Sequence, residues 1–107
     1  MIEKHHCIFC DKSLNKVLSV SNYFYIIRDT SYPVTKHHTL IISNRHVSDY
    51  FDLTNEELKE LNQILKIQKK ILLELDTEIT AFNIGVNVGT DAGQSIMHCH
   101  IHLIPRR

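Results

Sequence analysis

The sequence predicts an α+β fold in which one long helix packs on a mostly antiparallel five-stranded sheet. Short segments rich in β-branched and aromatic residues lie before and after a single long segment with helical periodicity. No repeat, low-complexity tract or linker divides the chain. Its 107 residues suit one domain (1–107), which is long enough to bury roughly two-thirds of the surface exposed by the unfolded chain.

The first three strands are predicted in the first half of the chain. The stretch "VLSVSNYFYIIRD" (17–29) is broken at Ser21-Asn22, so it is expected to form two short strands joined by a tight turn. The apolar stretch "HHTLIIS" (37–43) is predicted as a further strand. Pro33 has no N–H to donate to a sheet, so the preceding "SYPVTK" is expected to be a loop.

The helix is predicted to begin after Thr54. Thr54 and Glu57 have the spacing of a capping box, in which each side chain accepts a hydrogen bond from a free backbone N–H. Leucine and isoleucine then recur at spacings of three and four through "EELKELNQILKIQKKILLEL", and Asp76-Thr77 ends the pattern. A helix of about 22 residues spans about 33 Å.

Two strands are predicted after the helix. The stretch "EITAFNIGVNVG" (78–89) is expected to be a strand and "TDAGQS" a loop. "IMHCHIHLIP" contains the last strand (96–104), which is expected to stop before Pro105. The sequence leaves the order of the strands open, and a parallel pair joined through the helix is one alternative.

The composition excludes several classes of partner. Twelve basic and twelve acidic side chains cancel, so a broad basic surface for nucleic acid or an anionic membrane is not expected. No apolar run approaches the ~20 residues of a membrane helix, and "MIEKHHCIFC" has no signal-peptide core. An odd number of cysteines argues against a disulfide framework. We therefore expect a cytoplasmic protein, in which Cys7 and Cys10 are metal ligands or a redox pair.

Three histidines alternate with other residues in "MHCHIHL". Because side chains alternate across a strand, His98, His100 and His102 share one face, and the apolar residues between them share the face that packs on the helix. The outer two histidines are about 13 Å apart at Cα, so one metal ion bound by all three is disfavoured. A solvated strand face is the simplest alternative, but it poorly explains three histidines in strict alternation. The row suits phosphoryl or acyl transfer, in which one imidazole attacks while its neighbours orient it and stabilise anionic oxygens.

A polar loop, "NVGTDAGQS", directly precedes the histidine strand. Gly89 and Gly93 allow a close approach of the backbone, and Gln94 and Ser95 offer hydrogen-bond donors. Asn87, at the end of the preceding predicted strand, is within reach of the same site. Taken alone, the glycines are better explained by a plain hairpin connection, so only the position next to the histidines indicates a functional loop.

Several stretches resemble the histidine-triad (HIT) family. "AGQSIMHCHIHLIPRR" closely resembles its signature of three histidines separated by hydrophobic residues, and "FNIGVNVGTDAGQ" resembles the stretch before that signature. "HTLIISNRH" resembles the central strand of the family, and "CIFC" the N-terminus of its zinc-containing members. The resemblance covers nearly the whole chain. It departs at His37, where the family often has glycine.

The resemblance implies a compact HIT-like α+β domain with one long and one short helix, usually a homodimer, that hydrolyses or transfers nucleoside monophosphates. His100 matches the nucleophile that attacks the α-phosphorus and forms a nucleotidyl-histidine. His102 matches the residue that contacts the phosphate, and His98 the residue that orients the nucleophile. The matching substrate-binding residues are Asn87, Gln94 and Ser95 near the phosphates and Asp29 at the ribose.

Cys7 and Cys10 have the spacing of half a tetrahedral zinc site, within a predicted N-terminal zinc knuckle (5–13). The resemblance implies that His46 and His98 complete the set, so that a structural Zn²⁺ holds one end of the catalytic strand. His5 and His6 are expected to be exposed and not to bind the ion.

We therefore expect a nucleotide hydrolase that acts on dinucleoside polyphosphates such as diadenosine tetraphosphate. Hydrolysis of adenosine 5′-phosphoramidate is the enzymatic alternative. A zinc-stabilised nucleotide-binding module with little turnover is the alternative from another class.

Overall fold

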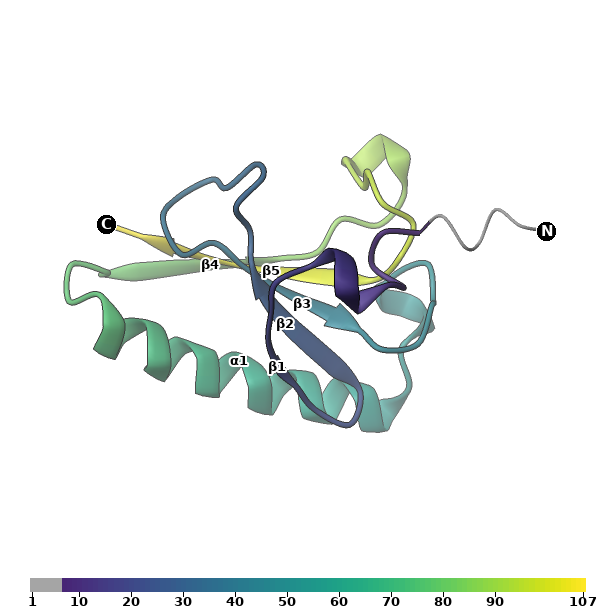
Figure 1. Ribbon diagram of the computed structural model, residues 1–107, viewed down its shortest axis with the longest axis horizontal. Coiled ribbons are helices and arrows are strands. Elements are labelled where there is room, and N and C mark those ends of the chain that lie inside the picture. The colour runs from purple at the N-terminus through teal and green to yellow at the C-terminus, as the bar shows by residue number, and fades with distance from the viewer. Residues whose placement is uncertain (1–6) are drawn as a thin grey trace.

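The computed structural model describes residues 7–107 and confirms the α+β fold (Figure 1). His5 and His6 lie outside the described residues. One helix, α1 (Asn55–Leu75), covers one face of a five-stranded sheet with the order β1-β2-β3-β5-β4. The strands are β1 (Val17–Val20), β2 (Phe24–Arg28), β3 (Thr39–Ser43), β4 (Ala81–Gly85) and β5 (His100–Arg106).

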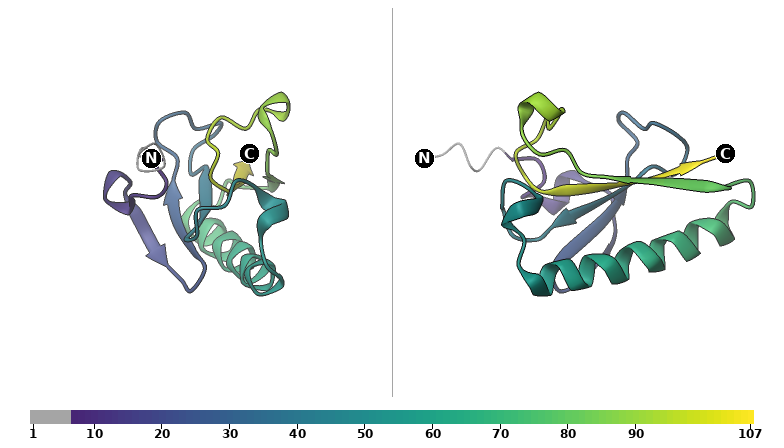
Figure 2. Two further views of the ribbon diagram at one scale, coloured as in Figure 1. Left: turned by 90° about the vertical axis from the view of Figure 1, so that its right-hand side faces the viewer. Right: turned by 180° about the vertical axis from the view of Figure 1, so that it is seen from behind.

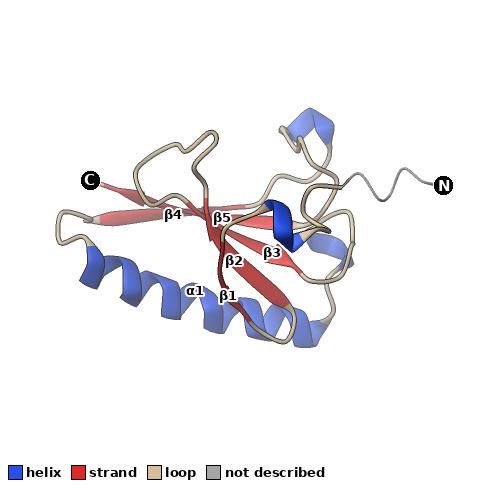
Figure 3. Cartoon of the chain, viewed as in Figure 1, coloured by secondary structure: helices blue, strands red, loops and turns tan. Residues whose placement is uncertain are grey.

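All four pairs of neighbouring strands are antiparallel (Figures 2 and 3). The predicted hairpin of β1 and β2 is confirmed. α1 connects β3 to β4, and β5 lies between these two strands and pairs with both. β3 and β4 therefore run parallel without pairing, which makes a split β-α-β unit. The strand order that the sequence left open is thus settled by the insertion of β5.

The predicted capping box of α1 is present. Thr54 Oγ1 accepts a hydrogen bond from the N–H of Glu57 (3.1 Å), and a Glu57 carboxylate oxygen accepts one from the N–H of Thr54 (2.8 Å). Glu57 is 1% exposed, and the guanidinium of Arg45 neutralises it through contacts of 2.7 and 2.9 Å. The helix ends at Leu75, with Asp76 as its C-cap, as predicted.

The core lies between the sheet and α1. The apolar residues between the histidines pack on the helix as predicted, with Cys99 and Ile101 against Leu61 and Ile64. Three short 3-10 helices, η2 (Lys12–Leu14), η3 (Tyr50–Asp52) and η4 (Thr90–Ala92), complete the described secondary structure. Within residues 7–107, no helix has the length and hydropathy needed to cross a membrane.

Three strands have other boundaries than predicted. β3 begins at Thr39 instead of residue 37, because His37 has a φ of +71° and turns the chain. β4 is limited to Ala81–Gly85. β5 continues through Pro105, whose carbonyl accepts a hydrogen bond from Thr35 Oγ1 (2.6 Å) on the side not bonded to β4. The proline nitrogen faces that same side, so no hydrogen bond of the ladder is lost.

The prediction that residues 96–104 form one strand with three histidines is wrong for His98. β5 begins at His100, and the preceding residues form a bend. In this bend the N–H of Cys99 donates to the carbonyl of Val47 (2.8 Å), and His98 Nε2 lies 2.7 Å from the carbonyl oxygen of Ser43. With Nε2 of His98 held at the end of β3, its Nδ1 faces the N-terminal cysteines.

Candidate active site and metal site

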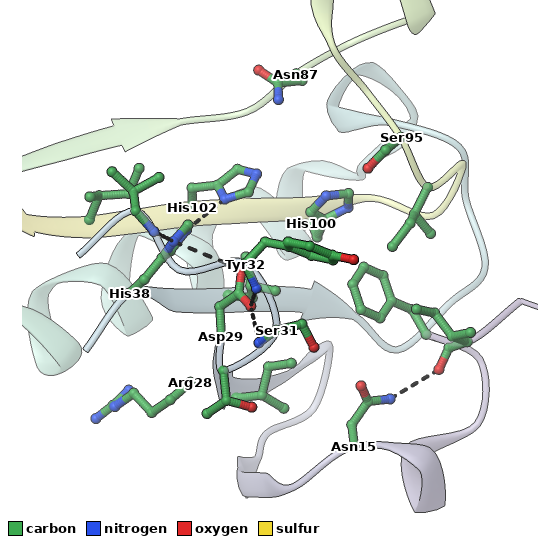
Figure 4. Close-up of a pocket in the computed structure, with 18 of the residues that line it drawn as sticks. Asn15, Arg28, Asp29, Ser31, Tyr32, His38, Asn87, Ser95, His100 and His102 are labelled. Atoms are coloured by element: carbon green, nitrogen blue, oxygen red, sulfur yellow. Dashed lines mark hydrogen bonds and ion pairs between the residues drawn. The ribbon is translucent and has the colours of Figure 1, made fainter. Parts of the chain in front are cut away.

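A cavity of about 720 Å³ lies on the face of the sheet opposite α1 (Figure 4). This volume is within the range of small-molecule binding sites. Of the predicted site residues, the cavity is lined by His100, His102, Asp29, Asn87 and Ser95. The fold thus brings together residues from β5, from the end of β2 and from the loop between β4 and β5.

His100 lines this cavity, and one of its ring nitrogens has a fixed hydrogen-bond partner. Its Nδ1 is 2.7 Å from the carbonyl oxygen of His98. A carbonyl only accepts hydrogen bonds, so Nδ1 is the protonated nitrogen and Nε2 keeps its lone pair. Burial lowers the pKa of His100, which keeps the ring neutral at pH 7. The geometry therefore presents a neutral imidazole whose Nε2 can act as a nucleophile.

His38 and His102 form a second pair of imidazoles. His38 Nδ1 accepts the N–H of Val34 (3.0 Å), so the proton of a neutral His38 is on Nε2. That Nε2 is 2.9 Å from Nδ1 of His102, which consequently accepts and leaves its own proton on Nε2. Figure 4 shows this remaining ring nitrogen of His102 on the cavity side. The pair therefore directs one N–H donor into the cavity.

Burial keeps this histidine pair uncharged. It lowers the pKa of His38, and burial together with the neighbouring His100 and His38 lowers the pKa of His102 to about 4. The donor on His102 is therefore a neutral N–H at pH 7.

Asp29 lies at the cavity wall next to His38. Its Oδ1 accepts hydrogen bonds from the N–H groups of Ser31 (3.0 Å) and Tyr32 (3.1 Å). Its Oδ2 lies 3.9 Å from His38 Nδ1, beyond hydrogen-bond distance. One carboxylate oxygen thus holds the loop in place and the other is available to a ligand.

The loop between β4 and β5 forms the opposite wall, where Asn87 and Ser95 lie (Figure 4). Gln94 does not line the cavity. It is 4% exposed, and its amide nitrogen donates to the carbonyls of Ser48 (2.7 Å) and Ile96 (3.0 Å) while its oxygen accepts the N–H of Gly89 (2.8 Å). In the structure, Gln94 therefore supports the loop from within.

The N-terminal knuckle supplies an apolar wall of the same cavity. Phe9, between the two cysteines, is 5% exposed, and its ring meets the ring of His100 edge-on at 5.0 Å. The hydroxyl of Tyr25 donates to the carbonyl of Phe9 (2.6 Å) and fixes the knuckle on β2. Ile27 and Leu40 belong to the same buried cluster and also line the cavity.

The four predicted metal ligands converge at one point. One ligand atom each from Cys7, Cys10, His46 and His98 lies within 4.8 Å of the others. Cys7 Sγ is 3.3 Å and His46 Nδ1 3.1 Å from His98 Nδ1, and Cys10 Sγ is 3.5 Å from the same atom. The predicted gathering of these residues is confirmed.

Most of these separations fit the tetrahedral coordination of a zinc ion. Usual zinc bond lengths place nitrogen ligands about 3.3 Å apart and a sulfur about 3.5 Å from a nitrogen. The contact of Cys10 Sγ with His46 Nδ1, at 2.8 Å, is shorter than this spacing. Nε2 of His98 faces the carbonyl of Ser43, which leaves the lone pair of Nδ1 directed at the cluster. Burial and the neighbouring Cys7 raise the pKa of the Cys10 thiol to about 11, so a bound cation is needed to make it a thiolate.

Sequence reasoning missed two residues of this site. The sequence predicts His38 only as part of the "HHTLIIS" strand, and its place within the stretch that resembles the HIT central strand is the signal that points to a role in the site. Phe9 lies between the two cysteines, and their spacing assigns it no role of its own. Its contact with His100 depends on how the knuckle folds over the sheet, which no local pattern reveals.

An α+β domain with a row of histidines on the open face of its sheet, joined at His98 to a Cys₂His₂ cluster, is a protein of the histidine-triad class. The model of the HIT domain family matches residues 12–107, and the chain belongs to this family.

Known proteins of the family resemble the chain over different lengths. It is 40% identical over 76 residues to the asymmetrical bis(5′-nucleosyl)-tetraphosphatase of Schizosaccharomyces pombe, a match that covers 70% of the chain and 41% of that relative. The structure of Plasmodium falciparum diadenosine triphosphate hydrolase in complex with Cyclomarin A shares 31% identity with a TM-score of 0.78, covering 85% of the chain and 60% of the hydrolase. A zinc-bound histidine triad family protein of Mycobacterium smegmatis shares 27% identity with a TM-score of 0.84, covering 96% and 76%. The chain thus spans less than two thirds of the length of the first two proteins.

Proposed function

We propose that this protein hydrolyses dinucleoside polyphosphates through a nucleotidyl intermediate on His100. The observation that carries the proposal is the state of His100, whose Nδ1 proton is held by the carbonyl of His98 while Nε2 faces the cavity. The tetraphosphatase and the triphosphate hydrolase named above are relatives whose names state this substrate class, and they support the proposal.

In the first step, Nε2 of His100 attacks the α-phosphorus. A P–N bond forms while the P–O bond to the departing nucleoside oligophosphate breaks, and the electron pair of that bond leaves with the oxygen. In the second step, water attacks the phosphorus and the P–N bond breaks. Nucleoside monophosphate is released, the lone pair returns to Nε2, and the proton of the water passes to solvent.

The neighbouring groups suit this reaction. The N–H that His102 directs into the cavity can donate to a non-bridging phosphate oxygen and offset charge as it develops. Asn87 and Ser95 can donate to the same phosphate or to the leaving group from the opposite wall. Oδ2 of Asp29, which has no hydrogen-bond partner among residues 7–107, can accept hydrogen bonds from ribose hydroxyls.

The proposed role of Gln94 is that of a positioning residue. All hydrogen bonds of its side chain go to backbone groups in and near the loop, and through them it positions Asn87 and Ser95 at the wall of the cavity. This role differs from the direct contact with phosphates that the resemblance implied.

We further propose that Cys7, Cys10, His46 and His98 hold a structural Zn²⁺. A Cys₂His₂ set is closed and offers no open position to a substrate. The ion, when bound, fixes the knuckle that contains Phe9 and the turn that contains His98. Two thiol ligands suit a reducing compartment such as the cytoplasm.

The proposed homodimer would use the free edge of β4. Ile84 on this edge strand is 61% exposed. An edge strand with an exposed apolar residue favours pairing with a second copy. Light scattering should give twice the mass of the chain, and Ile84→Lys should reduce it to the mass of one.

The proposed reaction is tested by comparing wild type with His100→Asn. Both proteins are incubated with diadenosine tetraphosphate and with adenosine 5′-phosphoramidate, and products and intact protein mass are followed. Wild type should show a transient nucleotidyl adduct, and the variant should lose the adduct and about 10³-fold or more in kcat. His37→Asn is the matched control, because it makes the same exchange at a histidine that does not line the cavity.

The outcomes separate the candidate functions. Turnover of the phosphoramidate alone favours the phosphoramidate hydrolase. Nucleotide binding without turnover of either substrate favours a binding module. Full activity of His100→Asn excludes His100 as the nucleophile.

A further inference from the structure

Tyr32 is an aromatic side chain at the cavity that the proposed reaction does not use. Its side chain is 89% exposed, more than any other large apolar or aromatic side chain among residues 7–107. It nevertheless lines the cavity that contains His100 and His102. Figure 4 shows its ring below His100, between Asp29 and the apolar wall. Among residues 7–107, no side chain or carbonyl makes a hydrogen bond with its hydroxyl. The ring is therefore a free apolar surface beside the cavity.

The loop that presents Tyr32 is tied down on both sides. The N–H of Tyr32 itself donates to Oδ1 of Asp29 (3.1 Å). Two residues later the N–H of Val34 donates to His38 Nδ1 (3.0 Å), and Thr35 Oγ1 donates to the carbonyl of Pro105 (2.6 Å). Two of these three anchors belong to the candidate active site. The backbone of Tyr32 is thus placed relative to the histidines by the site itself.

We propose that the ring of Tyr32 is the outer stacking surface for the nucleobase of the bound nucleotide. The inference rests on the proposed function, since it requires that a nucleotide binds here. The base is joined to the ribose, and the ribose is placed at Asp29, the residue that holds the Tyr32 backbone. The opposite side of the cavity is the apolar wall with Phe9 and Leu40. A planar base between this wall and the Tyr32 ring is covered on both faces.

Stacking on Tyr32 provides affinity with little choice between bases. Every nucleobase has a π-face, so an aromatic platform tolerates different bases. A larger purine ring covers more of the tyrosine than a pyrimidine does, and we expect purine nucleotides to bind more tightly. In this proposal the ring and not the hydroxyl supplies the interaction, so a phenylalanine at this position should serve as well.

The test compares a ligand with a base to one without. Binding of adenosine 5′-monophosphate and of ribose 5-phosphate is measured by calorimetry for wild type, Tyr32→Ser and Tyr32→Phe. Tyr32→Ser should weaken binding of the monophosphate about 5- to 100-fold and leave ribose 5-phosphate unchanged. Tyr32→Phe should bind as wild type does. Phe51→Ser removes another highly exposed ring, 79% exposed and outside the cavity, and is the matched control.

A spectroscopic readout is available because the chain contains no tryptophan. Tyr32→Trp places a single indole at the cavity, and adenosine 5′-monophosphate should quench its fluorescence while ribose 5-phosphate should not. In steady-state assays with diadenosine tetraphosphate, Tyr32→Ser should raise KM with little change in kcat, since stacking contributes equally to substrate and transition state.

Three results overturn the inference. If wild type binds the monophosphate and Tyr32→Ser binds it equally well, the ring does not stack on the base, and the proposed hydrolase stands. If Tyr32→Ser weakens ribose 5-phosphate to the same extent, the residue only shapes the loop. If wild type binds no nucleotide and turns none over, the proposed function fails together with the inference.

Discussion

Replacing His38 with phenylalanine removes the nitrogen atoms that set the tautomer of His102 while keeping a ring of similar volume. In the structure His38 accepts the N–H of Val34 at 3.0 Å and faces Nδ1 of His102 at 2.9 Å. His38 is 2% exposed, so water does not readily replace these contacts. The variant therefore leaves Nδ1 of His102 without a donor and frees the ring proton to move to that atom.

The magnitude follows from the two lost hydrogen bonds. Each contributes about 1 kcal/mol to stability, so the free energy of unfolding of His38→Phe should fall by about 2 kcal/mol. If the N–H of His102 stabilises the phosphate in the transition state, losing its orientation costs about 1–3 kcal/mol of activation free energy. This corresponds to a decrease of about 5- to 150-fold in kcat/KM.

The assay compares His38→Phe with a change at the adjacent histidine. His37 has a φ of +71°, which glycine adopts without strain, and its ring lies 3.8 Å from Asp76, away from the cavity. His37→Gly should therefore keep wild-type kcat/KM with diadenosine tetraphosphate and change the free energy of unfolding by no more than about 1 kcal/mol. Nitrogen NMR of the imidazoles reports the tautomer of His102 directly.

Two results would refute this reasoning. One is a wild-type kcat/KM for His38→Phe in a correctly folded protein. The other is an NMR spectrum in which His102 keeps its proton on Nε2 without His38. Either would mean that His102 is oriented by other contacts.

Three further predictions concern stability. His102 has a pKa of about 4 in the folded protein and about 6.5 in the unfolded chain, so the unfolded state binds more protons between these pH values. The free energy of unfolding, measured by urea denaturation, should therefore fall as the pH drops from about 6.5 to about 4, and it should fall less steeply in His102→Gln. Cys7→Ser should lose the stoichiometric zinc that elemental analysis detects in wild type, and it should unfold at a lower temperature. The control Cys99→Ser, at a buried cysteine outside the cluster, should keep its zinc. A metal-free wild type of full stability would contradict the proposed site. Leu72→Ala, at a fully buried position, should cost about 2–5 kcal/mol in chemical denaturation, and Leu73→Ala, 38% exposed, much less; equal losses would contradict the packing described.

The elements that were predicted well depend on neighbours in sequence. The capping box of Thr54 and Glu57 joins residues three positions apart, and the apolar stripe of α1 reflects the period of the helix itself. The hairpin of β1 and β2 needs only a short turn between two apolar runs. Such features are encoded within a few residues, and the structure confirms them.

The candidate site was predicted in part for the same reason. Alternation placed His100 and His102 on the face opposite the core, and the spacing of Cys7 and Cys10 indicated half of a metal site. His98 could not be assigned by alternation, since it lies in a bend before β5 where its ring and the N–H of Cys99 contact residues about fifty positions earlier in the chain. The role of Gln94 likewise depends on its contact with Ser48, which no local pattern shows.

The sequence alone accounts for the fold class, the long helix with its cap, the histidine row and the cysteine pair, because hydrophobic period and short-range hydrogen bonds act between residues close in the chain. The tautomers of the imidazoles depend on tertiary packing. The proton on Nε2 of His102 follows from His38, and the two meet because β3 pairs with β5 in the register that sets Leu40 opposite His102. The "MHCHIH" stretch is split in the same way, with His98 turned to the metal cluster and His100 to the cavity. Register and burial are properties of the whole sheet, and no short stretch of sequence contains them.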